Sequence, residues 1–511
     1  MKGLPIGISS FEEIRTGGYY YVDKTSFVKK LEEEGKYYFL SRPRRFGKSL
    51  FVDTLRCAFE GRKELFEGLY LEKNWNWEEK YPVVRISFVK DTLSVDDLKN
   101  RVRSIIKEKA REEEIEIEER ESIGTMLENL VKGLYRKNRK KVVLLVDEYD
   151  KAIIDNIEDR EKAERIRKEL KEFYSVLKDL DQYLRFVFIT GISKFAKVSL
   201  FSGLNQLNDI SLNKEYGDIC GYTEEELLKV FGELIKSDKE LEEIREWYNG
   251  YWWLGSKIYN PFDVLLYLQN RESESYWFET GNPGEGAPSP EFLVKLIREN
   301  NYYIPLVEEI VLRKEMLDWF DVEDIMIEVL MYQTGYLTIK KVEQKGDIKE
   351  VVLSYPNKEV RTALNLYISR KIEKGSYRWI KEIREIFERR EIEKIEELMN
   401  KVLLSIPYVW YKDTSRYESF YCALFYVLLV SSGLEVIAED VTSIGRIDLT
   451  VISKGKVYII ELKVDKEGAI EQIKEKRYYE KYKDREEIYL VGIVIDSRGR
   501  KVKKMEVERY R

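Results

Sequence analysis

The sequence predicts an α/β protein with three successive regions. Strand-like runs at residues 37–40, 83–88, 142–146 and 186–190 alternate with helical patterns, such as the one over residues 48–60. Several of these runs are apolar throughout, as expected of parallel strands covered by helices on both faces. The pattern then becomes mainly helical, and near the C-terminal end it returns to strands and helices. We therefore place domains at residues 1–222, 223–400 and 401–511.

Length and composition agree with this division. A chain of 511 residues is too long for one hydrophobic core, and 43% hydrophobic with 36% charged residues is typical of a globular protein. No apolar stretch is long enough to span a membrane, and the N-terminus lacks the apolar core of a signal peptide. Cys57, Cys220 and Cys422 lie too far apart for a metal or redox motif. We expect a soluble, cytoplasmic protein without a membrane partner.

The chain contains no histidine, which excludes every mechanism that needs a histidine base, nucleophile or metal ligand. Catalysis would have to use carboxylates, Lys, Arg, hydroxyl groups and bound metal, and oxygen ligands favour Mg²⁺ or Mn²⁺ over zinc. The net charge of -6 provides no global attraction to nucleic acid. Basic runs at residues 42–45, 136–141 and 498–504 are local, and solvated surface is the simpler interpretation unless a site lies nearby. The excess of Lys, Glu, Ile and Tyr is typical of a heat-adapted source.

A phosphate-binding loop is predicted directly after the first strand-like run. Such a loop needs a strand, a turn whose backbone N–H groups surround the phosphates, and Gly-Lys-Ser/Thr at the start of a helix. Gly47, Lys48 and Ser49 meet this requirement, although Arg42 stands where the first glycine of the motif is usual. Lys48 would contact the β- and γ-phosphates of ATP, and Ser49 would ligate Mg²⁺. Arg45 is a further candidate for contact with phosphate.

Acidic residues end a later strand of the same predicted sheet. Asp147 and Glu148 follow the apolar run 142–146, as in a Walker B element. Asp147 would hold Mg²⁺ through water, and Glu148 would orient the attacking water. Thr190 ends the next strand, where a residue that senses the γ-phosphate would lie. The three elements in order predict a P-loop NTPase domain.

A hairpin with two carboxylates is predicted near the C-terminal end. Residues 447–452 and 457–464 read as strands joined by a two-residue loop, Lys454-Gly455. Pairing about this loop sets Asp448 opposite Glu461, at about 5 Å between Cα atoms. The period of two along a strand puts Lys463 on the same face as Glu461.

Like charges opposed on a sheet are destabilising, and a divalent cation between them would remove that cost. Lys463 could then position or deprotonate a water molecule for phosphodiester hydrolysis. An exposed pair of acids is the alternative, but the strand before Glu461 is strongly apolar.

This hairpin resembles the PD-(D/E)xK nuclease superfamily, although Ile447 replaces the leading proline. The resemblance implies a restriction-endonuclease-like α-β-β-β-α-β core. It also implies an acidic metal ligand on the preceding helix, where Glu418 matches, with Glu439 as a second candidate. Gln472 lies on the following helix, where the superfamily often places a Gln or Lys near the site.

The whole chain resembles AAA-ATPase-like proteins fused to a PD-(D/E)xK nuclease domain. The segments that carry this resemblance are residues 42–49, 147–151, 247–251 and 259–261. The resemblance implies ATP binding and nuclease activity, and the missing first glycine of the P-loop is the family's own pattern. The aromatic segment 247–251 is better explained by packing than by base stacking.

Three functions are compatible with these features. The first is an ATPase whose nucleotide state gates a metal-dependent nuclease, with DNA the expected nucleic-acid partner. The second is a nucleotide-switched signalling or scaffold protein that binds nucleic acid without cutting it. The third, a DNA-translocating motor, needs a homo-oligomer and an arginine finger that the sequence does not identify.

Overall fold

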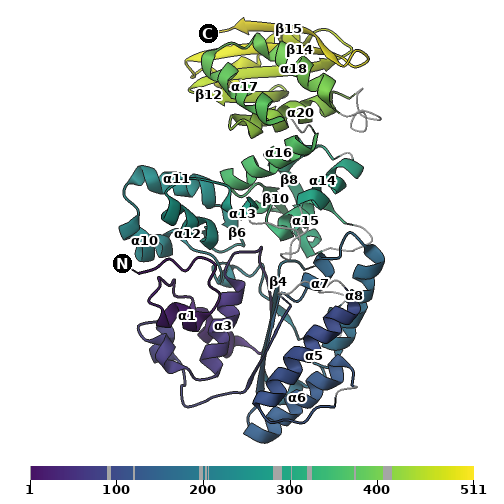
Figure 1. Cartoon of the computed structure of the whole chain (residues 1–511). Coiled ribbons are helices and arrows are strands. Elements are labelled where there is room, and N and C mark those ends of the chain that lie inside the picture. The colour runs from purple at the N-terminus through teal and green to yellow at the C-terminus, as the bar shows by residue number, and fades with distance from the viewer. Residues whose placement is uncertain are drawn as a thin grey trace. The chain divides into compact units, whose positions relative to one another are not determined.

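The computed structural model describes residues 2–88, 94–118, 121–194, 200–201, 204, 206–279, 290–300, 302–318, 325–372, 376–406 and 417–511. The chain forms two compact units (Figure 1). Unit 1 comprises Met1–Ser289 and Val311–Lys358, and unit 2 comprises Pro290–Ile310 and Glu359–Arg511. The predicted boundaries at residues 222 and 400 differ from those of the units, and the three-domain division stays a prediction.

The first half of unit 1 contains a parallel five-stranded sheet in the order β2-β3-β4-β1-β5. All four strand-like runs of the N-terminal region are confirmed. The strands are β1 (Tyr37–Ser41), β2 (Val83–Ser87), β3 (Val142–Asp147), β4 (Leu184–Gly191) and β5 (Asn208–Asp209). Strands β1 and β3 are buried along their whole length, which explains why their sequences are continuously apolar up to the polar residues at their ends.

Helices cover both faces of this sheet, as the sequence predicts (Figure 1). One face carries α3 (Lys48–Phe59) together with α1 (Phe11–Thr16), and the other carries α5 (Val95–Glu112) and α6 (Ile123–Asn138). The remaining helices of this half are α2 (Thr25–Glu34), α4 (Tyr70–Asn74), α7 (Lys151–Ile154) and α8 (Arg160–Ser175). The carboxyl ends of β1 and β3 lie at the same edge of the sheet, where the predicted phosphate site should form.

The second half of unit 1 is mainly helical. Its helices are α10 (Glu224–Phe231), α11 (Asp238–Tyr248), α12 (Pro261–Asn270), α13 (Tyr276–Glu279) and α15 (Ile327–Thr334). Helix α12 begins where Asn260 caps the backbone N–H of Phe262 and Pro261 occupies the first turn. The hairpin or winged element predicted at residues 332–356 is confirmed as β9 (Thr338–Lys345) and β10 (Ile348–Ser354). These strands join β8 (Ile310–Arg313) in the order β8-β10-β9, and β6 (Tyr251–Trp252) pairs with β7 (Lys257–Ile258).

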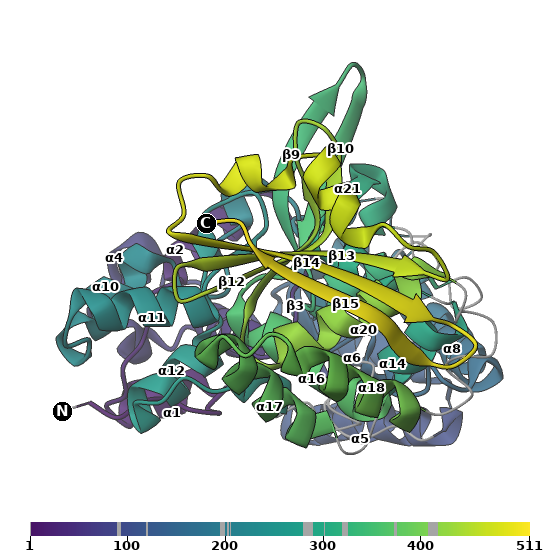
Figure 2. The same cartoon turned by 90° about the horizontal axis from the view of Figure 1, so that it is seen from above.

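Unit 2 contains a five-stranded sheet in the order β11-β12-β13-β14-β15. Its strands are β11 (Glu435–Val441), β12 (Arg446–Ser453), β13 (Lys456–Val464), β14 (Glu487–Asp496) and β15 (Lys501–Arg509). Its helices are α14 (Pro290–Glu299), α16 (Lys358–Ile372), α17 (Ser376–Arg389), α18 (Lys394–Ser405), α20 (Glu418–Ser431) and α21 (Ala469–Glu475). Figure 2 shows the sheet between α21 and the helices α17 and α18.

Two strands of this sheet escape the strand patterns read directly from the residues. The basic run at residues 498–504 leads into β15, which pairs antiparallel with β14 and lies at the edge of the sheet. Charged residues are common on edge strands because they discourage further pairing, and here they hide the strand pattern. The acids of β11 conceal the other edge strand in the same way.

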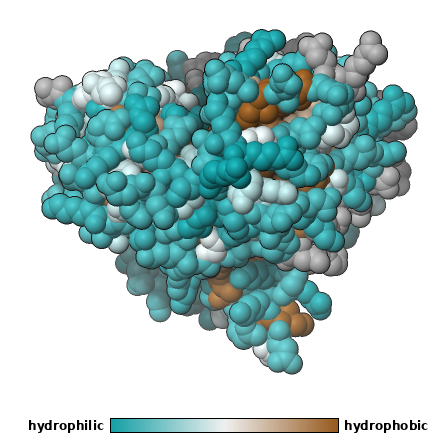
Figure 3. All heavy atoms as spheres, turned by 90° about the horizontal axis from the view of Figure 1, so that it is seen from below, coloured by the Kyte–Doolittle hydropathy of each residue, from teal (hydrophilic) through white to brown (hydrophobic). Residues whose placement is uncertain are grey.

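Surface character agrees with the composition. Hydrophilic residues cover most of the face seen in Figure 3. Among the described residues, no helix has both the length and the apolar character needed to cross a bilayer.

Candidate functional sites

The turn between β1 and α3 has the backbone of a phosphate-binding loop. Gly47 has a φ of 91°, in the left-handed region that glycine adopts without steric cost. Arg45 has a φ of 68°, which is unfavourable for a residue with a side chain. Its guanidinium lies over the ring of Phe262 of α12, 4.7 Å from the centroid, and this contact holds Arg45 in place.

Arg42 explains the absence of the first glycine. Its buried guanidinium donates hydrogen bonds to backbone carbonyls of Ser41, Ser211 and Tyr216, and it lies 4.4 Å from the ring centroid of Trp253. Burial lowers its pKa to about 10. Arg42 therefore ties the end of β1 to residues 211–217 and leaves phosphate contact to the later residues of the loop.

Lys48 and Ser49 begin helix α3 beside the same loop. The buried Lys48 Nζ donates to the carbonyl oxygens of Arg42 and Pro43, at 2.9 Å in each case. Burial also lowers the pKa of Lys48. Carbonyl oxygens are weaker partners for an ammonium than phosphate oxygens, so the lysine is positioned for exchange to an anionic ligand.

Asp147 and Glu148 lie at the end of β3, as the sequence predicts. Asp147 is fully buried, and no donor in the described part of the chain reaches its Oδ1. Glu148 has a φ of 56°, and burial, with the neighbouring Asp147 charge, raises its pKa to about 7. A carboxylate oxygen without a donor fits a bound cation, and a carboxyl group with a pKa near 7 suits a general base.

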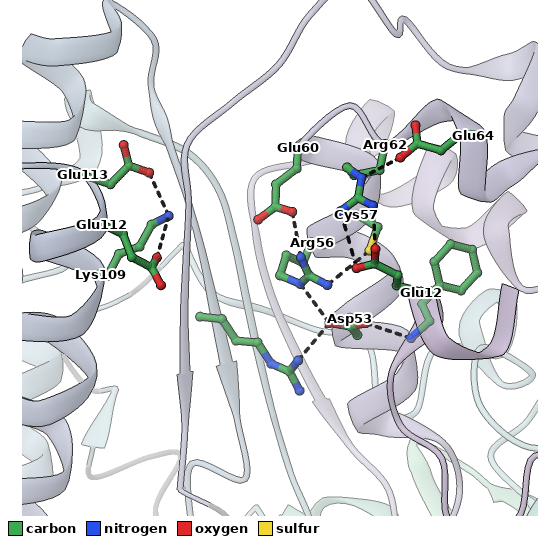
Figure 4. A network of polar contacts seen from close by, with 12 residues as sticks. Glu12, Asp53, Arg56, Cys57, Glu60, Arg62, Glu64, Lys109, Glu112 and Glu113 are labelled. Atoms are coloured by element: carbon green, nitrogen blue, oxygen red, sulfur yellow. Dashed lines mark hydrogen bonds and ion pairs between the residues drawn. The ribbon is translucent and has the colours of Figure 1, made fainter. Parts of the chain in front are cut away.

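Arg85 is a site residue that the sequence analysis missed. It stands on β2, with Nη2 3.5 Å from Asp147 Oδ2 and Nη1 2.9 Å from Asp53 Oδ1. Asp53 also pairs with Arg56 and accepts from the backbone N–H of Phe11 at the start of α1. Figure 4 shows Asp53 and Arg56 within this polar network. The sequence does contain a signal for this residue: Arg85 is an isolated charge inside an apolar strand, and such a charge needs a buried partner.

These residues surround a cavity of about 660 Å³ in unit 1, here called the P-loop cavity. Its cationic lining residues are Arg44, Arg45, Lys48, Arg85 and Lys151, and its carboxylates are Asp147 and Glu148. Gly47 and Ser49 line it as well, and apolar side chains such as Phe262 line another part. The excess of positive charge beside an apolar wall suits a ligand that joins phosphates to a flat apolar group.

Thr190 does not line this cavity. It is fully buried, and its hydroxyl donates to the Leu40 carbonyl on β1 at 2.8 Å. Thr190 lies beside the end of β3, where its carbonyl accepts from the Tyr149 N–H at 3.1 Å, but its hydroxyl is directed to β1 and not into the cavity.

The aromatic segment after α11 packs against the P-loop. Phe46 makes edge contacts with the rings of Tyr251 and Trp253, at centroid distances of 4.7 and 5.3 Å. Gly250 has a φ of 118°, and a Cβ there would lie 2.1 Å from the Pro356 carbonyl oxygen, so only glycine fits. Packing, rather than base stacking, thus accounts for these aromatics.

In unit 2, the hairpin forms around the predicted Lys454-Gly455 turn. Both turn residues have positive φ, 48° and 81°, as in a type I′ turn. The predicted pairs Ser453–Lys456 and Ile452–Val457 are confirmed, and pairing continues to Leu449–Ile460. One step further, the Asp448 carboxylate accepts a hydrogen bond from the backbone N–H of Leu462 at 2.7 Å. The Asp448 side chain thus takes the place of a backbone acceptor at the next position of the β12–β13 pairing.

Asp448, Glu461 and Lys463 lie together at this end of the hairpin and form the carboxylate site. Glu461 is 1% exposed, and its Oε2 has no hydrogen-bond partner among the described residues. Lys463 Nζ lies 3.5 Å from Glu461 and 3.4 Å from Glu418. Burial raises the pKa of both Asp448 and Glu461, and the charge of Asp448 raises that of Glu461 further. The three carboxylates outweigh the effect of burial and raise the pKa of Lys463.

The outer candidates also lie near this site. Gln472 Nε2 donates a short hydrogen bond to Glu461 Oε1. Close packing of α21 makes this possible, because a Cβ on Gly492, the β14 partner of Glu461, would lie 2.6 Å from the Ile470 backbone nitrogen. Glu439 lies on β11 and accepts from the hydroxyl of Tyr303 at 3.0 Å.

The residue types fit a divalent cation, but the ligand set is incomplete. In the described part of the chain, no group of three or more acidic or cysteine side chains has a metal-binding arrangement. Lys463 lies between Glu461 and Glu418, where it neutralises charge that a cation would otherwise neutralise. The orphaned Glu461 Oε2 supplies the oxygen donor that Mg²⁺ or Mn²⁺ prefers.

The fold and the two sites define the class of protein, which joins a P-loop ATPase-like core to a nuclease-like sheet. Family models support both parts: one described as predicted AAA-ATPase matches residues 5–201, and the PD-(D/E)XK nuclease superfamily matches residues 416–505. The chain belongs to the family of AAA-ATPase-like proteins fused to a PD-(D/E)XK nuclease superfamily domain.

A relative matches the chain over nearly its whole length. The chain is 42% identical over 520 residues to an uncharacterized protein in the vnfD 5′ region of Azotobacter chroococcum mcd 1, with 99% of each chain covered. Solved structures give only distant matches. Cdc6p from Pyrobaculum aerophilum is 14% identical with a TM-score of 0.25, covering 68% of this chain and 93% of its own. The Aeropyrum pernix ORC1 protein in complex with DNA is 12% identical with a TM-score of 0.25, covering 67% and 91%.

Proposed function

We propose that this protein binds and hydrolyses ATP in unit 1 and cleaves nucleic acid, with DNA the expected substrate, at a metal-dependent site in unit 2. The observation that carries the nuclease half is the buried pair Asp448 and Glu461 beside Lys463. A carboxylate whose second oxygen lacks a donor is costly to bury, and ligand binding offers a reason to retain it.

Within the carboxylate site, Asp448 and Glu461 would hold the cation, and Glu418 could join them once Lys463 moves. Bound Mg²⁺ or Mn²⁺ would supply Lewis acidity and would lower the pKa of a ligated water. Lys463 would remain protonated, as its raised pKa indicates, and donate to the attacking water or to a phosphate oxygen. Gln472 would fix the orientation of Glu461.

Within the P-loop cavity, Lys48 and Arg45 would bind the phosphates of ATP. Ser49 and Asp147 would hold Mg²⁺, which neutralises phosphate charge when bound. Glu148 would accept a proton from the attacking water. The net positive lining of the cavity supports this assignment, because a polyphosphate would find more cations than carboxylates there.

The contacts of the P-loop support a route for nucleotide gating within unit 1. Phe46 packs on Tyr251 and Trp253, and Arg44 lies 4.9 Å from the ring centroid of Trp277. A rearrangement of the loop on ATP binding would therefore be felt by the second half of unit 1. We propose that this change alters access of nucleic acid to the carboxylate site. A homo-oligomer stays a prediction.

A cleavage assay tests the proposal. Plasmid and single-stranded DNA would be incubated over a titration of Mg²⁺ or Mn²⁺, with and without ATP. We expect metal-dependent products from the parent, and no products from Asp448→Ala or Lys463→Ala variants that still bind ATP. Cleavage by both variants at the parental rate would show that the carboxylate site is not where cleavage occurs.

A second function is favoured by one observation, the absence of a complete three-ligand metal cluster among the described residues. In that case the protein would be a nucleotide-switched signalling or scaffold protein whose nuclease-like domain binds nucleic acid without cutting. Binding without products at any metal concentration would support this alternative and contradict the first proposal.

A further inference from the structure

A groove of about 340 Å³ lies between two segments of unit 2 near the carboxylate site. One wall is the turn between β11 and β12, with Val441 and Ile444. The other wall is the segment after α21, with Lys476, Arg477 and Lys481. We call this feature the turn groove.

The turn presents apolar side chains to solvent. Val441 is 65% exposed and Ile444 is 53% exposed. Thr442 fixes the turn, because its hydroxyl donates to the Gly445 carbonyl at 2.8 Å and accepts from the Gly445 N–H at 3.1 Å. Val441 ends β11 and Ile444 lies in the fixed turn that follows, so the two exposed aliphatic side chains offer a small apolar surface to a ligand.

The opposite wall combines an anchored cation with accessible ones. Lys481 pairs with the buried Asp440 and donates to the Val441 carbonyl at 3.0 Å, which holds the two walls together. Lys476 is exposed and has no ion-pair partner among the described residues. Arg477 lies 3.8 Å from Glu480, and both side chains are more than half exposed, so this pair contributes little.

Contacts connect the turn groove to the carboxylate site. The hydroxyl of Tyr478 lies 3.0 Å from the position of a Cβ on Gly445 in the turn. Burial raises the pKa of Tyr478, and Gln472 and Glu461 lie close enough to influence that pKa as well. Gln472 in turn donates to Glu461. Val441 pairs with Arg446, two residues before Asp448, which is about 7 Å along the strand.

We propose that the turn groove binds a single strand of nucleic acid beside the carboxylate site; this inference rests on the proposed nuclease function. Lys476 and Arg477 contact backbone phosphates, and Val441 and Ile444 pack against unstacked bases. In an intact duplex the bases face one another inside the stack, so the aliphatic side chains could gain contacts only by opening it. The groove therefore favours single strands and frayed ends over blunt duplex.

The basic edge strand β15 is the competing surface in unit 2. Lys503 and Lys504 are exposed there, but they pair with Glu467 at 2.6 Å and Glu506 at 2.9 Å. An acidic side chain therefore lies beside each of these two lysines, whereas no ion-pair partner of Lys476 lies among the described residues. Lys503 and Lys504 provide a matched control for the two cations of the groove.

The test measures equilibrium binding by the full-length protein in EDTA, so that no cleavage intervenes. Probes are a fluorescent oligothymidylate and a blunt hairpin duplex, with anisotropy recorded over a range of salt concentrations. The charge variant is K476E/R477E, and its control is K503E/K504E. The apolar variants are Ile444→Asp and Ile444→Ser, the second of which introduces no charge.

We expect the parent to bind the single strand more tightly than the duplex. K476E/R477E should bind roughly tenfold more weakly and lower the salt slope by about 1.4, the value for two phosphate contacts to a single strand. Both Ile444 variants should reduce the preference for single strands, and Ile444→Ser should leave the salt slope unchanged. K503E/K504E should bind like the parent.

Several results would overturn the inference. These are no binding of either probe, equal or tighter binding of the duplex, or a larger loss for K503E/K504E than for K476E/R477E. The outcome is separable from that of the proposed function. If metal-dependent cleavage is unchanged in the groove variants, strand binding in the turn groove is contradicted and the nuclease proposal stands. If the groove variants weaken binding but no cleavage occurs with any metal, the nuclease proposal alone is contradicted.

Discussion

Lys48 in unit 1 and Lys463 in unit 2 have opposite surroundings. Lys48 donates to two backbone carbonyls in a cavity where cationic residues outnumber carboxylates. Lys463 lies between the carboxylates of Glu461 and Glu418, at 3.5 and 3.4 Å. Burial lowers the pKa of Lys48, while surrounding carboxylates raise that of Lys463.

The difference indicates which kind of ligand each site takes. Excess positive charge at the P-loop cavity favours a polyanion, and excess negative charge at the carboxylate site favours a cation. Each site also contains a buried carboxylate oxygen without a donor in the described chain, Asp147 Oδ1 and Glu461 Oε2. The following substitutions test whether the two sites act as this contrast indicates.

The largest effect is expected for Glu461→Gln, with Asp448→Asn as its companion. Either change removes a carboxylate that would hold the cation, so DNA cleavage should fall by a factor on the order of 10⁴, the scale for loss of a central catalytic group. ATP hydrolysis should be unchanged. Glu435→Gln, on β11 of the same sheet, is the control and should cleave like the parent. Cleavage within tenfold of the parental rate would show that the carboxylate site does not hold the catalytic cation.

Glu148→Gln should slow ATP hydrolysis roughly 10³-fold while nucleotide binding is retained. Burial raises the pKa of the Glu148 carboxyl group to about 7, and only the ionised carboxylate accepts a proton. In the parent, kcat/KM should therefore rise about tenfold per pH unit below this value and level off above it. Glu158→Gln, at an exposed glutamate of the same unit, is the control. A pH-independent parental profile would argue against Glu148 as the base.

Arg85→Gln should weaken ATP binding about tenfold or more, because it removes a charged hydrogen-bonding group from the P-loop cavity. Arg85→Lys should restore part of the affinity. Arg62→Gln alters the same polar network outside the cavity (Figure 4) and should leave affinity unchanged. Equal losses for Arg85→Gln and Arg62→Gln in a nucleotide titration would assign Arg85 a purely structural role.

Gln472→Ala should lower metal affinity about tenfold, within the range for groups that orient a metal ligand. The variant removes the donor to Glu461 Oε1 and leaves both carboxylates in place. Calorimetric Mn²⁺ titration measures the change directly. An unchanged affinity would show that Glu461 is held without Gln472.

The smallest effect concerns stability without metal. The pKa of Glu461 is raised in the folded protein, so its ionisation opposes folding and stability falls as pH rises above the ordinary glutamate range. Glu461→Gln cannot ionise, so in EDTA at pH 7 its Tm should exceed the parental value by a few degrees, where about 1 kcal/mol corresponds to ~2–4 °C. The difference should shrink as pH is lowered. A lower Tm for the variant would contradict the unfavourable burial of this charge.

Local patterns were enough to predict the elements that carry both sites. Apolar runs predicted the strands that end at Ser41 and Asp147, and the Lys454-Gly455 pair predicted a turn whose register is confirmed. These features depend on neighbouring residues, so a single sequence contains them. The same register predicted that Asp448 would lie opposite Glu461. The observed pairing ends one step earlier, at Leu449–Ile460, where the Asp448 carboxylate accepts from the Leu462 N–H instead.

Features that depend on distant contacts could not be predicted in this way. The sequence shows Arg42 as a replacement for glycine, but only the fold shows that it bonds to carbonyls around residue 211. The position of Thr190 at a strand end predicted a γ-phosphate sensor, yet its hydroxyl is directed to the Leu40 carbonyl. An isolated Arg in an apolar strand indicates a buried partner for Arg85, but only the fold shows that its partners are Asp53 and Asp147. Gln472 was a candidate through the family resemblance, and the fold adds its hydrogen bond to Glu461.

Equilibrium Mn²⁺ binding tests the contrast between the sites most directly. The parent, Glu461→Gln and Asp147→Asn would each be titrated without nucleotide and with a non-hydrolysable ATP analogue. We predict nucleotide-independent binding that is lost in Glu461→Gln and kept in Asp147→Asn. We also predict an additional Mn²⁺ site that appears only with the ATP analogue. Binding at this second site should be lost in Asp147→Asn and kept in Glu461→Gln. Mn²⁺ binding in the absence of nucleotide that survives Glu461→Gln, or no such binding in the parent, would contradict the account.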